Sequence, residues 1–310
     1  MKINLANIKK AIKLLNKSEC VAVPTETVYG LAGNAYSDSA CKKIYKLKKR
    51  PKNNPLIVHY YNHQSLKEDC SYNKNFIKLY KKFCPGPITF ILDLKKNSKI
   101  SKIATNKKKT LAVRFPKHPV TRNLLKKLNF PLAAPSANLS SKVSAVCSKN
   151  VKEDFGKKIK YVLEGGKSSI GLESTIIDIR NRPKILRLGG LENSIIEKAL
   201  NKKILINNKS KRILSPGQFK LHYSPGIPIR LHFKEIKKNE AVLFITKKKE
   251  NKSNYYFLSK KGDLREAARN LYSTLRKIKK NKYKSIAVAR IPNEGLGKTI
   301  NDRLIRASKF

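Results

Sequence analysis

The stretch between Val21 and Ala35 holds residues that can bind a small polar ligand. A short apolar run, Cys20 to Val23, ends at Pro24 and is followed by the polar triplet Thr25-Glu26-Thr27 and then by closely spaced glycines. Apolar and β-branched residues that end at a proline predict a buried strand whose tip carries the polar residues. Hydroxyls and a carboxylate at a strand tip can hold a small polar ligand. A buried hairpin with capped backbone groups fits the same residues.

Two further polar groups stand where predicted elements end. Lys48 and Arg50 lie between a helix expected at 38–48 and a strand expected at 56–60, where they would clamp phosphate oxygens or form one more surface lysine run. The apolar run Leu132 to Ala134 breaks into the segment 135–141, which is rich in small hydroxyl and amide residues. That segment is either a strand tip that offers hydrogen bonds to a ligand or an ordinary turn.

The elements that must position these residues predict an α/β fold. Strands alternate with helices and also follow one another directly, which favours a twisted sheet of mixed direction over a doubly wound one. Helices are expected at 4–16, 38–48, 73–83, 119–128 and 194–200, with strands at 20–23, 56–60, 88–94, 111–113, 132–134, 161–164, 174–179 and 184–188.

The remainder of the chain predicts a linker and a second, smaller α/β domain. The lysine- and asparagine-rich segment 201–212 is a natural linker, and the segment 215–226 lies between two Ser-Pro-Gly triplets. Strands are then expected at 229–233, 241–246, 255–258 and 285–289, with helices at 264–278 and 297–308. We therefore divide the chain into a domain at 1–200, a linker at 201–228 and a domain at 229–310.

The charge balance allows two interpretations. Lysine and arginine number 70 against 20 acidic residues, a formal net charge of +50, and such a charge favours contact with tRNA or double-stranded RNA. Yet the lysines are spread over the whole chain, and asparagine and isoleucine are abundant too, as in proteins encoded by AT-rich genomes. Since no run of about 18 apolar residues and no signal-peptide pattern occurs, we expect a cytoplasmic protein without a membrane span.

Several common sites lack their motifs. The five cysteines form no C-x-x-C pair, and the histidines are scattered, so neither a disulfide framework nor a metal site is indicated. The run Gly295-Leu296-Gly297-Lys298-Thr299 imitates a phosphate-binding loop, but Pro292 stands where that motif needs glycine. Dinucleotide-binding and α/β-hydrolase motifs are also missing from the sequence.

A set of motifs in order along the chain carries a family resemblance. They are the runs 24–31, Lys48-x-Arg50-Pro51, 54–59, 85–89, 113–116, 134–138, 173–177 and 186–190. Together they resemble the threonylcarbamoyl-AMP synthase family, and they span residues 5–200. The segment 215–225 and the elements after it resemble the two-domain branch of that family. The resemblance implies a YrdC-like catalytic domain followed by a small Rossmann-like domain.

The resemblance implies a nucleotidyltransferase that makes threonylcarbamoyl-AMP and pyrophosphate from L-threonine, bicarbonate and ATP with Mg²⁺. A downstream tRNA threonylcarbamoyltransferase would pass the threonylcarbamoyl group to the adenosine beside the anticodon. By the family pattern, L-threonine is held by Thr27, His59, Arg114, Ser174 and the backbone of Ala134. ATP is held by Arg50, Asn54, Thr110, Ser136, Ser144, Arg187 and Tyr223. Lys48 and Arg50 form the catalytic basic pair, and the segment 215–225 is expected to close over the site as a lid.

Two other functions compete with this one. A basic RNA-binding protein could use a YrdC-like fold without catalysis, although the retention of Lys48, Arg50, Ser136, Asn138 and Arg187 argues against it. Carbamoyl transfer in hydrogenase maturation also uses a YrdC-like domain, but there it comes with cysteine motifs that this sequence lacks.

Overall fold

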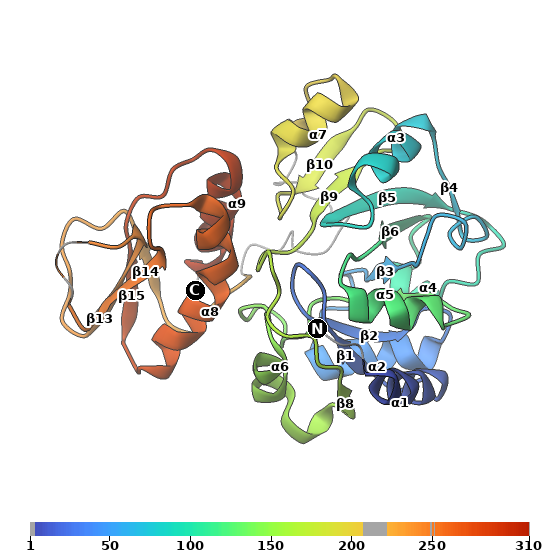
Figure 1. The fold of residues 1–310 in the computed structure, drawn as a ribbon, viewed down its shortest axis with the longest axis horizontal. Helices are drawn as coiled ribbons and strands as arrows, with labels where there is room; N and C mark the ends of the chain where they lie inside the picture. Colours follow the sequence, from blue (N-terminus) through green and yellow to red (C-terminus); the bar gives the residue numbers. More distant parts are fainter. Residues whose placement is uncertain (1–3, 207–221, 249, 251, 310) are drawn as a thin grey trace.

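The structure is a computed structural model that describes residues 4–206, 222–248, 250 and 252–309. Strands β1 to β11 form a large sheet and β12 to β15 a small one, and each sheet belongs to its own domain (Figure 1). We call residues 4–206 the first domain and residues 229–309 the second domain.

The first domain alternates short strands with short helices. Its helical segments are α1 (Leu5–Asn16), α2 (Asp38–Lys48), α3 (Lys74–Phe83), α4 (Lys102–Thr105), α5 (Pro119–Lys126), α6 (Ser148–Phe155), the 3₁₀ turn Gly156–Lys158 and α7 (Asn193–Leu200). Its strands are β1 (Val21–Val23), β2 (Gly30–Asn34), β3 (Ile57–His59), β4 (Cys70–Ser71), β5 (Ile88–Leu94), β6 (Thr110–Arg114), β7 (Leu132–Ala133), β8 (Tyr161–Val162), β9 (Thr175–Asp178), β10 (Lys184–Arg187) and β11 (Leu205–Ile206).

The large sheet is mixed. Its strand order is β11-β10-β9-β5-β6-β3-β7-β2-β1-β8, and β4 also pairs with β5. Strand β3 runs parallel to β6, whereas β5 runs antiparallel to β6. The twisted α/β sheet of mixed direction expected from the sequence is therefore confirmed.

Strand residues alternate between the two faces of this sheet, and the faces are covered differently. In β1, Ala22 packs in a cluster with residues of α2, α3 and α7, whereas Val21 and Val23 pack with α1 and α5. Further along that second face lies a small apolar cluster made of strand residues alone, namely Ile57, Ile91, Ala112, Ile176 and Leu186. The polar residues described below gather on this part of the sheet.

Helix starts follow the local sequence. Helices α1, α2 and α3 are each preceded by a residue whose side-chain oxygen accepts a hydrogen bond from a backbone N–H of the first turn; these residues are Asn4, Ser37 and Asn73. Such capping satisfies backbone donors that have no partner inside the helix. The three helices therefore begin within one residue of the positions expected from the sequence.

The second domain has two layers. Its elements are β12 (Ile229–Leu231), β13 (Glu240–Thr246), β14 (Tyr255–Ser259), α8 (Leu264–Lys280), β15 (Ser285–Val288) and α9 (Gly295–Ala307). The sheet is parallel, in the order β12-β15-β13-β14. Helices α8 and α9 lie between this sheet and the first domain (Figure 1), so these two helices face the first domain. The expected small α/β domain is thereby confirmed.

One part of the chain combines the two alternatives that the sequence allowed, and another part differs from the expectation. The residues after Pro24 lead into β2, which pairs antiparallel with β1, so this stretch is a buried hairpin as well as part of the pocket described below. Strand β11 lies in the segment expected to be linker and pairs with β10. Leu205 and Ile206 are exposed, so backbone pairing and not burial forms this strand, and hydrophobic periodicity could not indicate it. Residues 207–221 of the expected linker and lid lie outside the described residues.

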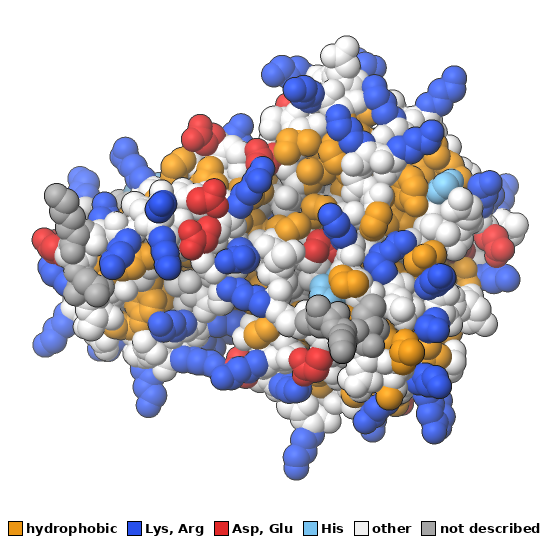
Figure 2. Space-filling model, in the orientation of Figure 1, with side chains coloured by type: hydrophobic (Ala, Val, Ile, Leu, Met, Phe, Trp, Pro, Cys, Tyr) orange, Lys and Arg blue, Asp and Glu red, His pale blue; other side chains and the backbone are white. Residues whose placement is uncertain are grey.

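Cationic side chains are abundant on the face of the molecule drawn in Figure 2. Figure 2 shows lysine and arginine side chains scattered over both domains on the visible face, without one concentrated patch. In the part of the chain that the structure describes, no helix is long and apolar enough to cross a membrane.

Candidate active site

A row of paired residues crosses five strands of the large sheet. His59 of β3 pairs with Arg114 of β6, and Arg114 pairs with Thr89 of β5. Thr89 pairs with Ile176 of β9, which pairs with Arg187 of β10. Because neighbouring strands lie about 4.8 Å apart, the row spans about 19 Å. Directly paired residues point to the same face, so the register brings an imidazole and two guanidinium groups to one surface.

A β-bulge aims Arg187 at this surface. The pairing between β9 and β10 shifts after Ile185, so that Arg187 and not Leu186 lies opposite Ile176. A bulge adds one residue to a strand and changes the direction of the side chains that follow. Leu186 packs in the apolar cluster on this face, and Arg187 next to it lines the pocket.

The loop after β7 forms a second wall and is fixed by Lys48. Ser136 bridges to Gly30, and the backbone N–H of Ala137 donates to the Tyr29 carbonyl. The Lys48 ammonium donates to the carbonyls of Ser136 and Asn138 at 2.5 Å each. Burial, together with the neighbouring Arg50 charge, holds the pKa of Lys48 well below its usual range. Lys48 therefore positions the loop from behind and does not itself line the pocket.

Arg50 reaches the pocket because helix α2 ends sharply. Lys49 takes a left-handed conformation with φ of 48°, which turns the chain after Lys48. Arg50 then donates to the Asn54 carbonyl at 2.9 Å, to Asn54 Oδ1 at 2.6 Å and to the Pro55 carbonyl at 2.8 Å. Burial lowers the pKa of Arg50 to about 10. The guanidinium is thus fixed in direction and remains positively charged at neutral pH.

Arg114 and His59 form a cationic corner with unpartnered atoms. Arg114 donates to Glu26 Oε1 at 2.8 Å, and the backbone N–H of Lys117 donates to the other carboxylate oxygen. Among the described residues, Arg114 Nε and His59 Nδ1 are buried and have no hydrogen-bond partner. Burial, and then the charge of Arg114, holds the pKa of His59 well below its usual range, so its imidazole is neutral. Buried polar atoms without partners are expected where a ligand supplies the missing bonds.

Glu173 and Ser174 immediately precede β9. Ser174 contacts residues of neighbouring strands, and Glu173 bonds to side chains of both domains. The Ser174 hydroxyl lies 2.7 Å from that of Thr89, and Arg187 donates to the Ser174 carbonyl. Glu173 accepts hydrogen bonds from Ser144 in the first domain and from Tyr272 and Arg303 in the second. Although burial alone would raise the pKa of Glu173, the charges of Arg303 and Arg187 lower it to about 2.

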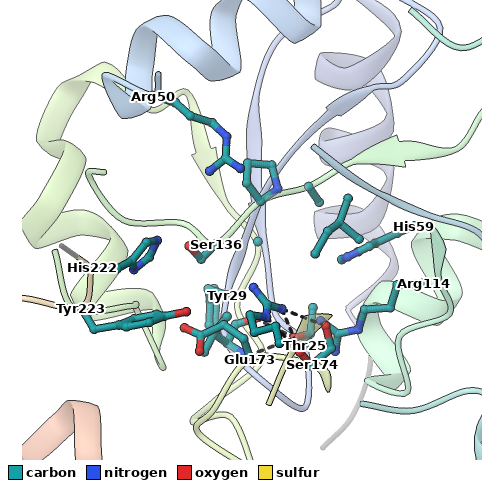
Figure 3. Close-up of a pocket in the computed structure, with 16 residues that line it drawn as sticks. Thr25, Tyr29, Arg50, His59, Arg114, Ser136, Glu173, Ser174, His222 and Tyr223 are labelled. Carbon is teal, nitrogen blue, oxygen red and sulfur yellow. Dashed lines mark hydrogen bonds between the residues drawn. The ribbon is translucent and has the colours of Figure 1, made fainter. Parts of the chain in front are cut away.

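These residues surround one cavity. His59 and Arg114 approach from one side, Arg50 from the end of α2, and His222 and Tyr223 from the opposite side (Figure 3). The free volume between them is small, about 40 Å³, which is room for only a few water molecules. The pocket is lined by Thr25, Val28, Tyr29, Gly30, Arg50, Ile57, His59, Arg114, Ala134, Pro135, Ser136, Glu173, Ser174, Arg187, His222 and Tyr223.

The structure brings eight of the residues selected from the sequence to this cavity: Arg50, His59, Arg114, Ala134, Ser136, Ser174, Arg187 and Tyr223. Thr27, Lys48, Asn54 and Ser144 lie one layer behind. Thr27 contacts the Thr25 hydroxyl at 2.8 Å, and Ser144 donates to Glu173 at 2.6 Å.

Thr110 is not brought to the pocket. It stands at the start of β6, whereas Arg114 stands at the end. A strand rises about 3.3 Å per residue, so the two α-carbons are about 13 Å apart.

Sequence reasoning missed several residues at the pocket. Thr25, Tyr29, Glu173 and His222 all line it, and each is adjacent to a selected position or lies in a quoted motif. That adjacency was the available signal. Tyr272 and Arg303 lie about a hundred residues and more from Glu173 in the sequence, and no local pattern indicates them.

The charge inside the pocket favours an anionic ligand. Among the described residues, three guanidinium groups, those of Arg50, Arg114 and Arg187, line the pocket, and the one lining carboxylate, Glu173, is already bound by Arg303. Among the described residues, no group of three or more histidine, cysteine or acidic side chains is placed to hold a metal ion. The arrangement suits a carboxylate and a phosphate chain held by bidentate donors.

Comparisons with known proteins agree with this geometry. The Sua5, YciO and YrdC family model, described as "Telomere recombination", matches residues 13–189, and the model "Threonylcarbamoyl-AMP synthase, C-terminal domain" matches residues 191–309. The threonylcarbamoyl-AMP synthase of Bacillus subtilis is 34% identical over 98% of this chain and 94% of its own length. The enzyme of the same name from Pyrococcus abyssi is 33% identical over the same shares.

A solved structure matches both domains. The crystal structure of P. abyssi Sua5 complexed with L-threonine superimposes with a TM-score of 0.91 at 31% sequence identity, covering 99% of this chain and 96% of that one. The two family models match consecutive parts of the chain, and the relatives align with almost its whole length. Both findings give the same family. The chain belongs to the two-domain Sua5 family of threonylcarbamoyl-AMP synthases.

Proposed function

We propose that this protein condenses L-threonine, bicarbonate and ATP into threonylcarbamoyl-AMP and pyrophosphate. The observation that carries the proposal is the convergence of Arg50, Arg114 and Arg187 with Ser136 and Ser174 in one buried cavity. The reaction makes the protein a nucleotidyltransferase. None of the lining groups is an obvious covalent nucleophile, which agrees with catalysis by positioning and charge stabilisation.

The reaction balances in two steps. The amine of threonine attacks bicarbonate, and water leaves as the carbamate forms. An oxygen of the carbamate then attacks the α-phosphorus of ATP, and pyrophosphate leaves with the electron pair of the broken P–O bond. Both steps require two anions to approach each other, so their rates depend on cations that are fixed before the substrates bind.

The threonine end of the cavity is the corner of Arg114 and His59. Arg114 Nε is buried without a partner and can donate to the threonine carboxylate, while the neutral imidazole of His59 can accept a hydrogen bond. Ser174 offers a hydroxyl beside this corner. The related P. abyssi structure was solved in complex with L-threonine, which supports threonine as a ligand of this protein.

The nucleotide end is formed by Arg50, Ser136 and Arg187, with Tyr223 facing them. Guanidinium groups suit phosphate oxygens because they donate in pairs. Lys48, expected as a member of the catalytic pair, acts in this proposal by holding the carbonyls of the Ser136 loop. Thr110 lies at the other end of β6 and does not line this cavity, so its contact with ATP stays a prediction.

Magnesium enters this proposal as part of the substrate. Mg²⁺ keeps several waters and is commonly bound through substrate phosphates with one or two carboxylates. The carboxylate that lines the cavity, Glu173, is bound by Ser144, Tyr272 and Arg303. We therefore assign the metal to the phosphates of MgATP and not to a protein cage.

The substrates extend beyond the most enclosed part of the cavity. Its free volume of about 40 Å³ is too small for MgATP and threonine together, since one water molecule alone needs about 10–15 Å³ on this measure. His222 and Tyr223 belong to the segment expected to act as a lid, and they lie on the side of the cavity opposite Arg114 (Figure 3). The unstable product would then pass to a tRNA threonylcarbamoyltransferase in the same compartment, which we take to be the cytoplasm.

The test is pyrophosphate release by the purified protein from MgATP and bicarbonate, with and without L-threonine. We expect release that requires both threonine and bicarbonate and that Arg50→Ala abolishes. The matched control is Arg180→Ala, because Arg180 pairs with Asp178 and Asp93 at the surface and away from the cavity. Folded protein that binds ATP but releases no pyrophosphate with threonine would refute the proposal and favour the RNA-binding alternative.

A further inference from the structure

The second domain contacts the residue that closes the cavity. Helix α9 lies against the loop after β10, where Thr299 donates to the Gly189 carbonyl and Arg303 to the Leu188 carbonyl. Helix α8 contributes Tyr272, which donates to Glu173. Arg303 and Tyr272 meet at Tyr223, so two helices from the second domain reach the wall of a pocket built on the first.

Tyr223 is held on two sides by the second domain. The Arg303 guanidinium lies 4.6 Å from the centre of the Tyr223 ring, and the Tyr272 ring stacks on it at 5.9 Å with an interplanar angle of 16°. A guanidinium over an aromatic face is attractive, and more so when water is excluded. All three side chains are at most 1% exposed, so these contacts act without competition from solvent.

Glu173 braces both of these side chains. Arg303 Nε donates to it at 3.0 Å and the Tyr272 hydroxyl at 2.9 Å. The carboxylate is ionised at neutral pH, because the Arg303 and Arg187 charges outweigh burial and lower its pKa to about 2. Arg303 also donates to Asp302 and to the Leu188 carbonyl, so its guanidinium has a fixed orientation.

Tyr223 itself is in a conformation that needs support. Its φ is 65°, in the left-handed region that a tyrosine rarely adopts. Its hydroxyl is buried without a hydrogen-bond partner among the described residues. Such states persist only where the surroundings determine them. The support on the first-domain side is the backbone pairing of Ser224 with residues 141–143.

We propose that Arg303 and Tyr272, braced by Glu173, are positioning residues that hold Tyr223 in its place at the nucleotide end of the cavity. The second domain thereby completes the active site of the first. This inference rests on the proposed function for its kinetic test but not for its structural one. Neither residue touches the reacting atoms; each acts through Tyr223.

The competing explanation is that these contacts only dock the domains. Arg276 supplies the matched control, because it is also a largely buried arginine that crosses the interface. It donates to both carboxylate oxygens of Asp154 and to the Val143 carbonyl. In the described chain its link to Tyr223 is indirect, through Val143, whose N–H donates to the Ser224 carbonyl, so this control makes the comparison stricter. If the contacts only dock the domains, substitutions of Arg303 and of Arg276 should change the activity to the same extent.

The first experiment compares Arg303→Gln with Arg276→Gln in the full-length protein by pyrophosphate release. We expect Arg303→Gln to lower kcat/KM for ATP by about tenfold to a hundredfold, the range for a misplaced active-site group, and Arg276→Gln to change it by less than about threefold. In a Tyr223→Ala background, Arg303→Gln should add less than about twofold, because the residue it positions is gone. Equal effects of the two arginine variants, or full additivity with Tyr223→Ala, would overturn the proposal.

The second experiment needs no activity. The chain contains no tryptophan, so Tyr223→Trp introduces a single tryptophan at this position, which can be excited selectively over the tyrosines. Adding Arg303→Gln should shift its emission to the red and increase quenching by acrylamide, Tyr272→Phe should do so less, and Arg276→Gln should leave it unchanged. An unchanged emission with Arg303→Gln in protein that still melts cooperatively would refute the positioning role. If wild-type protein releases no pyrophosphate, the proposed function fails. The fluorescence measurement still tests whether Arg303 and Tyr272 position residue 223.

Discussion

Replacing Arg114 by lysine separates threonine binding from nucleotide binding. Arg114 has one donor engaged with Glu26 at 2.8 Å, while its Nε is buried without a partner among the described residues. A lysine keeps the positive charge and can still pair with Glu26, so the fold is expected to survive. What it loses is the second, directed donor, because an ammonium cannot present the fixed fork of a guanidinium.

The size of the effect follows from that lost donor. A hydrogen bond to a charged group contributes about 1.5–3 kcal/mol, and about 1.4 kcal/mol corresponds to a factor of ten in an equilibrium constant. The threonine KM should therefore rise about tenfold to 150-fold in Arg114→Lys. The ATP KM should change by less than about threefold, because Arg50 and Arg187 approach the cavity from other elements.

The assay is pyrophosphate release with threonine varied at saturating MgATP, and then with MgATP varied at saturating threonine. Arg180→Lys is the control, since it makes the same change in a surface ion pair with Asp178. A threonine KM within twofold of the wild-type value would show that Arg114 does not bind the carboxylate. An equal rise in both KM values would point to a general loosening of the pocket.

Three further perturbations test other contacts. Lys48→Met removes the two bonds to the carbonyls of the loop 136–138 and should raise the ATP KM about tenfold with little change for threonine; equal rises would contradict this role. Glu240→Gln removes a carboxylate whose pKa is lowered to about 2, against burial, by the Arg230 hydrogen bond. The stabilisation by the Glu240 carboxylate is complete above pH about 4.5 and is lost as the pH falls towards 2. The difference in melting temperature between wild type and variant should therefore shrink in acid. A difference that stays constant with pH would show that the ionisation of Glu240 is not linked to stability. Gly189→Ala places a methyl 2.3 Å from the Ser174 carbonyl carbon and should cost about 2 kcal/mol or more in urea unfolding; an unchanged midpoint would contradict the close approach.

Local sequence patterns were sufficient for most elements and for the site's chemical character. Helix α2 begins at Asp38 after the Ser37 cap, and β5 spans Ile88–Leu94, as expected from capping and from a run rich in apolar and β-branched residues. The polar residues at strand ends do lie together. The reason is that the two-residue period of a strand places alternate residues on one face, and this period is visible in the local sequence.

What the sequence could not supply depends on contacts distant along the chain. The bulge that turns Arg187 towards the cavity arises in the pairing of β9 with β10, and no residue type marks it. Likewise, Lys48 reads as a phosphate ligand because a basic pair flanks a loop, yet in the fold its ammonium is taken up by two carbonyls. Residue type specifies which bonds a side chain can make, whereas only the fold decides which partner it meets.

The buried cations and the surface lysines of this protein have different explanations. Among the described residues, the buried cations are Lys48, Arg50, Arg114, Arg187 and Arg303, and each of them lines the cavity or holds a group that does. Burying a cation is costly in free energy unless hydrogen bonds or opposite charges compensate. Compositional bias alone therefore does not explain the cations at these positions. A lysine on the surface keeps its ammonium in water and costs little, which lets a biased genome accumulate many of them. The charge of +50 is consequently weak grounds for an RNA-binding function, whereas four buried arginines around one small cavity require an explanation, and an anionic substrate supplies it.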